Sequence, residues 1–185
     1  MPAPITVVIP TLNAAAELPG SLGALMEGLA EGLIREVVIS DGGSSDATLQ
    51  LAAEAGAELV SGTASRGGQL RRGCAAARGE WLLVLHADTQ LQAGWSDVVA
   101  AHLARAEAGY FKLAFDKGGL PALIVAGWAN LRSKVFRLPY GDQGILITRA
   151  LYDEIGGYRD IPLMEDVAIA RALRGQLCAL GASAK

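Results

Sequence analysis

Short apolar runs alternate with longer stretches of helical periodicity through the first half of the chain. Ile5 to Ile9, Glu36 to Ile39 and Trp81 to Leu85 predict buried strands, and a weaker strand is expected near Glu58 to Val60. Between Ala15 and Leu33, leucines recur at steps of three and four, which predicts a helix with one apolar face. Those leucines are Leu18, Leu22, Leu25, Leu29 and Leu33.

Two more helices are expected between these strands. One spans Asp46 to Ala55, with Ser45 or Asp46 as its cap, and the other runs from about Gly67 to Ala77. Strands that alternate with helices are typical of βαβ units. The pattern therefore predicts an α/β domain with a Rossmann-like, mostly parallel sheet flanked by helices.

The second half of the chain has a less regular pattern, which predicts a mixed arrangement. Its expected strands are Gly109 to Phe115 and Ile145 to Thr148. Its expected helices lie near Ser96 to Arg105, from about Leu120, near Leu151 and at Met164 to Arg174. No repeat or linker divides the chain, and 185 residues fit one domain.

Composition and charge narrow the class of protein. Hydrophobic residues make up 51% of the chain and charged residues 19%, which is enough apolar material for a packed globule. The formal net charge of −3 gives no basic footprint for nucleic acid. Cys74 and Cys178 are too few for a disulfide framework and fit a reducing compartment. The first apolar run lacks a basic region and is broken by Pro10, so no export signal is expected and a cytoplasmic location is predicted.

The most membrane-like stretch is Gly118 to Leu131, which falls short of the roughly 20 apolar residues that a spanning helix needs. We expect a buried helix there. The alternative is a peripheral membrane contact or a contact between identical subunits.

A carboxylate follows the strongest strand of the predicted sheet. In open α/β sheets ligands collect beyond the carboxyl ends of the strands, which is where Asp88 would lie. Mg²⁺ and Mn²⁺ prefer oxygen ligands, so Asp88 is a candidate metal ligand, and His86 can add a nitrogen to Mn²⁺. The alternative is that Asp88 only caps the next turn with Thr89.

Two further segments follow predicted strands. Asp41 begins a glycine-rich turn and can accept a hydrogen bond from a base or a ribose hydroxyl, although the segment also fits an ordinary polar turn. Arg66 precedes a helix whose first amides favour anions, and its guanidinium can hold a phosphate oxygen. The alternative is a solvated surface charge.

Glu165 and Asp166 lie at the start of the last predicted helix. A carboxylate fixed there, facing a cleft, can act as a general base toward an acceptor hydroxyl. The alternative is that both residues only complement the helix dipole, as acidic residues in a first turn commonly do.

Taken in order, these segments resemble the family 2 glycosyltransferases with the GT-A fold. PTLNAAAEL resembles the family's entry motif after the first strand, and ISDGGSSDAT resembles its second-strand element. LHADT is placed like its Asp-x-Asp metal motif, and MED like the Glu-Asp motif that carries its catalytic base. The run from RGGQLRRG through HADT to LPYGDQG and MEDV is most similar to a subgroup named for arsenosugar biosynthesis.

The resemblance implies a metal-dependent, inverting hexosyltransferase that moves a sugar from a nucleotide-diphosphate donor to an acceptor hydroxyl. Residues 1–95 would form the nucleotide-sugar-binding half and residues 96–185 a mixed acceptor-side half of a single domain. Asp88 with His86 would hold Mn²⁺ or Mg²⁺ at the diphosphate, and Asp166 with Glu165 would be catalytic. The residues implied to contact the nucleotide are Pro10, Thr11, Glu17, Asp41 and Arg66, and those implied to shape the acceptor side are Gly141, Asp142 and Gln143.

Two departures from the family pattern bear on this interpretation. His86 replaces the first Asp of the metal motif, so binding by two carboxylates is not expected. Family members usually continue past the final helix, whereas this chain ends at Lys185, and we therefore expect a shortened chain or an incomplete catalyst.

Two rival functions are open to such a chain, one on the same broad fold and one of a different, non-catalytic class. A sugar-phosphate nucleotidyltransferase usually needs a basic, glycine-rich loop after its first strand, which PTLNAAAEL is not. A non-catalytic nucleotide-sugar-binding module would fit the short C-terminus. A dehydrogenase is disfavoured because no G-x-G-x-x-G follows the first strand.

Overall fold

The computed structural model describes residues 2–105, 107–114, 143–161, 163–173 and 175–185. Within these residues one seven-stranded sheet has the order β3-β2-β1-β4-β6-β5-β7. The strands are β1 (Ile5–Thr11), β2 (Ile34–Asp41), β3 (Glu58–Ser61), β4 (Trp81–Val84), β5 (Ala108–Leu113), β6 (Ile145–Thr148) and β7 (Leu177–Ala184). Of the described strands only β6 runs opposite to the others, because it pairs antiparallel with both β4 and β5. The mostly parallel sheet predicted from the sequence is confirmed.

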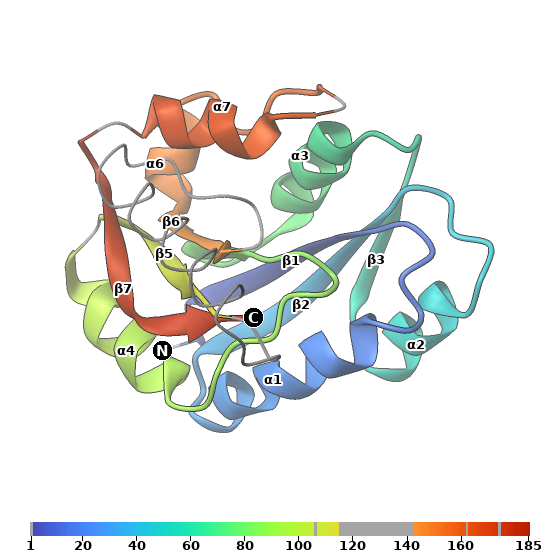
Figure 1. Ribbon diagram of the computed structural model, residues 1–185, viewed down its shortest axis with the longest axis horizontal. Coiled ribbons are helices and arrows are strands. Elements are labelled where there is room, and N and C mark those ends of the chain that lie inside the picture. The colour runs from blue at the N-terminus through green and yellow to red at the C-terminus, as the bar shows by residue number, and fades with distance from the viewer. Residues whose placement is uncertain (1, 106, 115–142, 162, 174) are drawn as a thin grey trace, which may run out of the picture.

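Helices cover both faces of the sheet (Figure 1). They are α1 (Leu18–Ala30), α2 (Thr48–Glu54), α3 (Arg66–Ala76), α4 (Trp95–His102) followed by the short 3-10 turn η1 (Leu103–Arg105), α6 (Arg149–Glu154) and α7 (Glu165–Ala172). Two apolar clusters make up the described core. One packs α1, α2 and α4 on one face, and the other packs α3, α6 and α7 on the opposite face. The described helices therefore form one layer on each face of the sheet, as in other α/β domains.

Two details of the sequence prediction are wrong. Leu29 is 52% exposed rather than on the buried face of α1, because the indole of Trp95 packs against Gly28 in that last turn. The last strand, β7, was not expected from the pattern of its residues, and it forms by pairing parallel with β5. The expected helix from about Leu120 lies outside the described residues.

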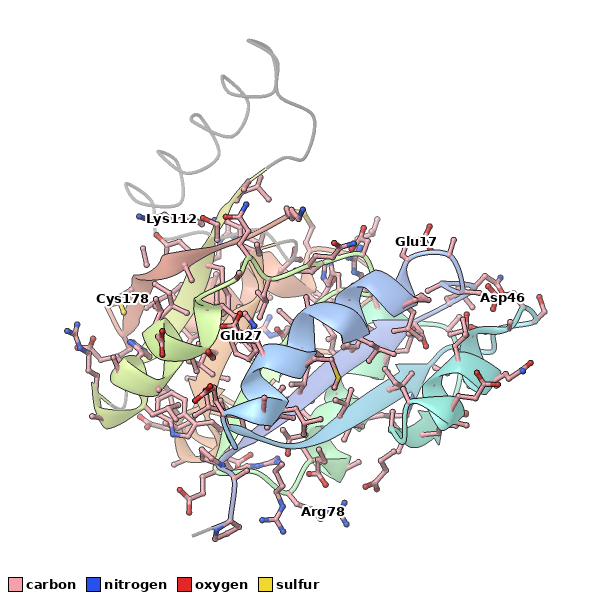
Figure 2. The ribbon with its side chains drawn as sticks, turned by 90° about the horizontal axis from the view of Figure 1, so that it is seen from below. Glu17, Glu27, Asp46, Arg78, Lys112 and Cys178 are labelled. Atoms are coloured by element: carbon pink, nitrogen blue, oxygen red, sulfur yellow. The ribbon has the colours of Figure 1, made fainter. Side chains whose placement is uncertain are left out.

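The register of the central strands brings their carboxyl ends to one edge. Thr11 of β1 lies opposite Asp41 of β2, and Leu85, directly after β4, donates its amide to Val8 O at 3.0 Å. Figure 2 shows Glu17 and Asp46 at the end of the molecule away from Arg78, which precedes β4 at its amino-terminal end. The loops after β1, β2 and β4 therefore meet at a single edge of the sheet.

Candidate functional site

A cavity of about 580 Å³ opens at this edge. Its walls come from the loop after β1, the start of α3 and the turn after β4. The structure brings together in its lining six residues that the sequence singled out, namely Pro10, Thr11, Glu17, Arg66, His86 and Asp88. The remaining nucleotide candidate, Asp41, is buried and is not among the lining residues.

Gln69, which was not among the predicted site residues, holds α3 against the strands at the base of the cavity. Gln69 of α3 is buried, and its Nε2 donates to Thr11 O at 2.7 Å and to Ser40 O at 3.2 Å. Gly73, one turn further along α3, has no room for a side chain against Val8. α3 therefore lies directly on the ends of β1 and β2, with its first turn beside the cavity.

The carboxylate of Asp41 organises the turn after β2. It accepts hydrogen bonds from the Thr11 hydroxyl at 2.9 Å, from the Gly43 and Ser44 amides at 2.7 and 2.8 Å, and from the Ser44 hydroxyl at 2.5 Å. Burial alone would raise the pKa of Asp41, but the hydrogen bonds from Ser44, Gly43 and Thr11 outweigh it and hold the pKa below its usual value. Asp41 is therefore ionised and fully engaged by the protein in this structure.

The loops after β1 and β2 are joined to each other by reciprocal hydrogen bonds. Asn13 donates its amide to Ser44 Oγ at 2.8 Å, and its side-chain oxygen accepts from the Ser45 amide at 2.8 Å. Ser45 or Asp46 was expected to cap the next helix, but Ala47 holds the N-cap position of α2. Asp46 instead accepts from the Thr48 amide at 3.0 Å and from the Ala15 amide at 3.0 Å. These bonds hold the loop after β1, which lines the cavity, against the loop after β2.

Arg66 contacts two of the other candidate residues. Its Nε lies 3.1 Å from Glu165 Oε1, and its Nη2 lies 2.6 and 3.0 Å from the two ring nitrogens of His86. Arginine only donates, so a His86 nitrogen that accepts from it carries no proton. A metal ion on that nitrogen would have to displace the guanidinium, and the role of His86 as a metal ligand stays a prediction.

Asp88 differs from its neighbours in being open to the cavity. It is exposed, and no hydrogen bond or ion pair of its carboxylate occurs within the described part of the chain. The turn is instead closed by the backbone, with the Thr89 amide donating to His86 O at 3.1 Å. The alternative role of Asp88 as a cap for Thr89 is therefore not observed.

No three side chains of the His, Cys, Asp or Glu type gather as a metal-binding group in the described residues. A single open carboxylate nevertheless fits Mg²⁺ or Mn²⁺ when phosphate oxygens and water complete the coordination. Asp88 satisfies that requirement, whereas a site built from protein ligands alone does not form here.

The start of α3 is closed differently from the sequence expectation. Its first amides were expected to favour an anion, but Gly67 donates its amide to Ile161 O at 3.1 Å and Gly68 to Ser65 Oγ at 3.4 Å. Ser65 in turn donates to Asp160 Oδ1 at 2.6 Å. The protein itself occupies this helix end, so the side chain of Arg66, not the helix amides, is left for an anion.

The two acidic residues of α7 lie in different surroundings. Glu165 has a side chain that is 2% exposed, whereas Asp166 is half-buried. Burial raises the pKa of Tyr158 well above its usual value, and the negative charges of Asp166 and Glu165 raise it further. Both carboxylates therefore lie close enough to the buried Tyr158 phenol to act on it.

The residues expected on the acceptor side are only partly placed. Gly141 and Asp142 lie outside the described residues. Gln143 is fully buried and donates its Nε2 to Phe111 O at 3.1 Å, which holds it against β5. This bond lets Gln143 support the sheet, and its part on the acceptor side stays a prediction.

Comparison with known proteins decides the family. Residues 6–122 match the family described as "Glycosyl transferase family 2". The chain belongs to that family. A comparison with curated protein sequences gives no match.

Several solved structures share its fold. A TarS structure from S. aureus superposes with a TM-score of 0.71 at 18% identity, over 96% of this chain and 58% of that one. Glucosyl-3-phosphoglycerate synthase from Mycobacterium tuberculosis, solved with Mn²⁺, UDP and glucosyl-3-phosphoglycerate, gives 0.67 at 20% identity over 95% and 68%. A TarS complex with UDP-GlcNAc gives 0.66 at 17% identity over 96% and 56%.

These likenesses establish the GT-A fold, as predicted. The chain spans just over half the length of the TarS structures. No helix within the described ranges has the length and apolar character needed to cross a membrane. The segment 118–131, considered above for a membrane or subunit contact, lies outside the described residues.

Proposed function

We propose that this family 2 chain binds a nucleotide-diphosphate sugar in the cavity beside Asp88 and transfers the sugar, with inversion, to an acceptor hydroxyl. The observation that carries the proposal is the open carboxylate of Asp88 in one cavity with Arg66. A diphosphate is an anion and needs positive charge close to it. The chain as a whole has a net charge of −3, so this positive charge must come from individual groups in the cavity. Arg66 supplies one such charge locally.

Asp88 would hold Mn²⁺ or Mg²⁺, with diphosphate oxygens and water as the other ligands. When bound there, the cation stabilises the negative charge that develops on the departing diphosphate. Support comes from the M. tuberculosis synthase of the same fold, whose structure contains Mn²⁺ and UDP. Within this chain, Arg66 would share the diphosphate charge through its fixed guanidinium fork.

The nucleoside would lie along the loop after β1, over Pro10 and Thr11. Glu17 is exposed in the cavity wall and can accept a hydrogen bond from a ribose hydroxyl. Asp41 already accepts from four donors, so it can contact the base only by giving up one of them.

Asp166 would act as the general base. It is half-buried at the start of α7, and it would accept the proton of the acceptor hydroxyl as that oxygen attacks the anomeric carbon from the face opposite the diphosphate. Residues 1–95 would thus bind the donor and residues 96–185 would shape the acceptor side. Membership of the arsenosugar-biosynthesis subgroup remains a proposal that rests on the sequence motifs alone.

Thermal-shift measurements with UDP- and GDP-sugars, with and without Mn²⁺, test the binding step. A donor-hydrolysis assay then tests turnover in the wild type, Asp88→Ala and Asp166→Asn, with Asp97→Asn on α4 as a control outside the cavity. We expect hydrolysis in the wild type and the control, and a loss of about 10²-fold or more in Asp166→Asn. Binding without turnover would instead support the non-catalytic module, and undiminished turnover in both Asp88→Ala and Asp166→Asn would end the proposal.

A further inference from the structure

We propose that Glu165 is a positioning residue for donor binding, which acts by holding Arg66, and that it does not accept the acceptor's proton. This inference rests on the proposed function. It gives two adjacent acidic residues different roles: Glu165 supports binding of the nucleotide-sugar donor, and Asp166 acts on the acceptor hydroxyl.

The contacts of Arg66 define the arrangement. Nε is paired with Glu165 at 3.1 Å, and Nη2 contacts His86 at 2.6 and 3.0 Å. For Nη1 no partner occurs among the residues that the structure describes. The guanidinium is planar and rigid, so fixing two of its nitrogens also fixes the direction of the third. The Arg66 side chain is 45% exposed and lines the cavity. Glu165 and His86 thus leave Nη1 as the nitrogen available to a phosphate oxygen.

The burial of Glu165 argues for this role. Its side chain is 2% exposed, so a substrate in solution has little access to it. A buried carboxylate is tolerated only when a cation or several hydrogen-bond donors compensate for its lost hydration, and Arg66 provides that compensation. The ion pair therefore compensates the buried charge of Glu165 and at the same time orients Arg66.

Separate contacts bring α7 to α3 at this point. The Gly67 amide donates to Ile161 O at 3.1 Å, and the Ser65 hydroxyl donates to Asp160 Oδ1 at 2.6 Å. A side chain at Gly67 would collide with the backbone oxygen of Arg159. The segment that leads into α7 is thus seated on the first turn of α3 by contacts that do not involve Glu165, so the position of α7 should survive removal of the Glu165 charge.

Binding of UDP and of GDP in buffer with EDTA, measured by calorimetry, tests the role without a metal ion. Glu165→Gln should weaken binding by about tenfold, as expected for loss of one charge-assisted contact. Glu154→Gln, which changes an exposed acidic residue of α6, should leave the affinity unchanged. Arg66→Ala should weaken binding at least as much as Glu165→Gln, and adding Glu165→Gln to Arg66→Ala should have no further effect.

Kinetics and spectroscopy provide the remaining readouts. Glu165→Gln should raise the donor KM with little change in kcat, and Glu165→Asp should restore part of the affinity. In the ligand-free wild type, the Arg66 Nε–H resonance should exchange slowly with solvent, and Glu165→Gln should abolish that protection. Additive binding losses in the double variant, a kcat effect without a KM effect, or an unprotected Arg66 Nε–H in the wild type would each overturn the inference. Failure of the wild type to bind either nucleotide would instead count against the proposed function, while the resonance measurement would still decide whether Glu165 orients Arg66.

Discussion

The Nε2 of Gln69 donates a 2.7 Å hydrogen bond to the carbonyl oxygen of Thr11, which ties the first turn of α3 to the end of β1. The same nitrogen lies 3.2 Å from Ser40 O at the end of β2. One uncharged side chain therefore fixes the helix that carries Arg66 relative to the ends of β1 and β2. The geometry of the cavity therefore depends on a residue that carries no charge and was not among the predicted site residues.

Gln69→Leu is expected to destabilise the fold by about 1–3 kcal/mol, because the buried carbonyl acceptors lose their shared donor. Urea unfolding measures the change. Gln50→Leu is the matched control, since Gln50 is exposed and its only described side-chain bond is to Glu54 within the same turn of α2. A loss no larger than that of the control would contradict the structural role given to Gln69.

Two glycine substitutions should have opposite effects. Gly67→Ala would place a methyl group against the backbone oxygen of Arg159, which cannot move without unseating the loop before α7. Gly23→Ala meets nothing within 4 Å on α1. We expect Gly67→Ala to lower the midpoint of thermal unfolding and Gly23→Ala to raise stability by about 0.5–1 kcal/mol through helix propensity. A neutral Gly67→Ala would show that the loop does not pack on α3 as described.

The stability of the protein should depend on the charge of Asp41 at acid pH. Burial would raise the pKa of Asp41, but the bonds from Ser44, Gly43 and Thr11 lower it in the folded state, so the unfolded chain binds this proton first. The contribution of Asp41 is therefore fully present above the unfolded pKa of about 3.9, and it is lost as the pH falls through the lower folded pKa.

Guanidinium unfolding between about pH 2 and pH 6 measures this dependence around the unfolded pKa. Asp41→Asn should lower stability near neutral pH and flatten the acid limb. Ser44→Ala, which removes one of the four described donors, should give an intermediate slope. An acid limb of unchanged slope in Asp41→Asn would contradict the assignment.

The placement of the site could be predicted because parallel strands deliver their following loops to one edge. Buried runs identified β1, β2 and β4, and the residues at or just after their carboxyl ends, such as Thr11, Asp41 and His86, then had to lie near one another. Only the order of elements and the direction of the strands were needed for that step, and both follow from hydrophobic periodicity and short connections.

The partners within the site could not be predicted, because they depend on packing between distant segments. Glu165 stands in a first helical turn, where acidic residues are ordinary, and nothing local indicates that α7 is seated on α3 beside Arg66. Gln69 stands in a segment that the sequence marked for its arginines. β7 is rich in small residues with no clear alternation, and it becomes a strand only through its pairing with β5.

Calorimetric titration of UDP and GDP with Mn²⁺ present, or with EDTA in its place, tests the central claim most directly when the wild type is compared with Asp88→Ala. We predict that Mn²⁺ strengthens binding of at least one nucleoside diphosphate to the wild type by about tenfold or more, and that Asp88→Ala removes the Mn²⁺ effect while leaving the affinity in EDTA unchanged. Equal Mn²⁺ enhancement in the wild type and Asp88→Ala, or no binding of either nucleotide to the wild type, would contradict the account.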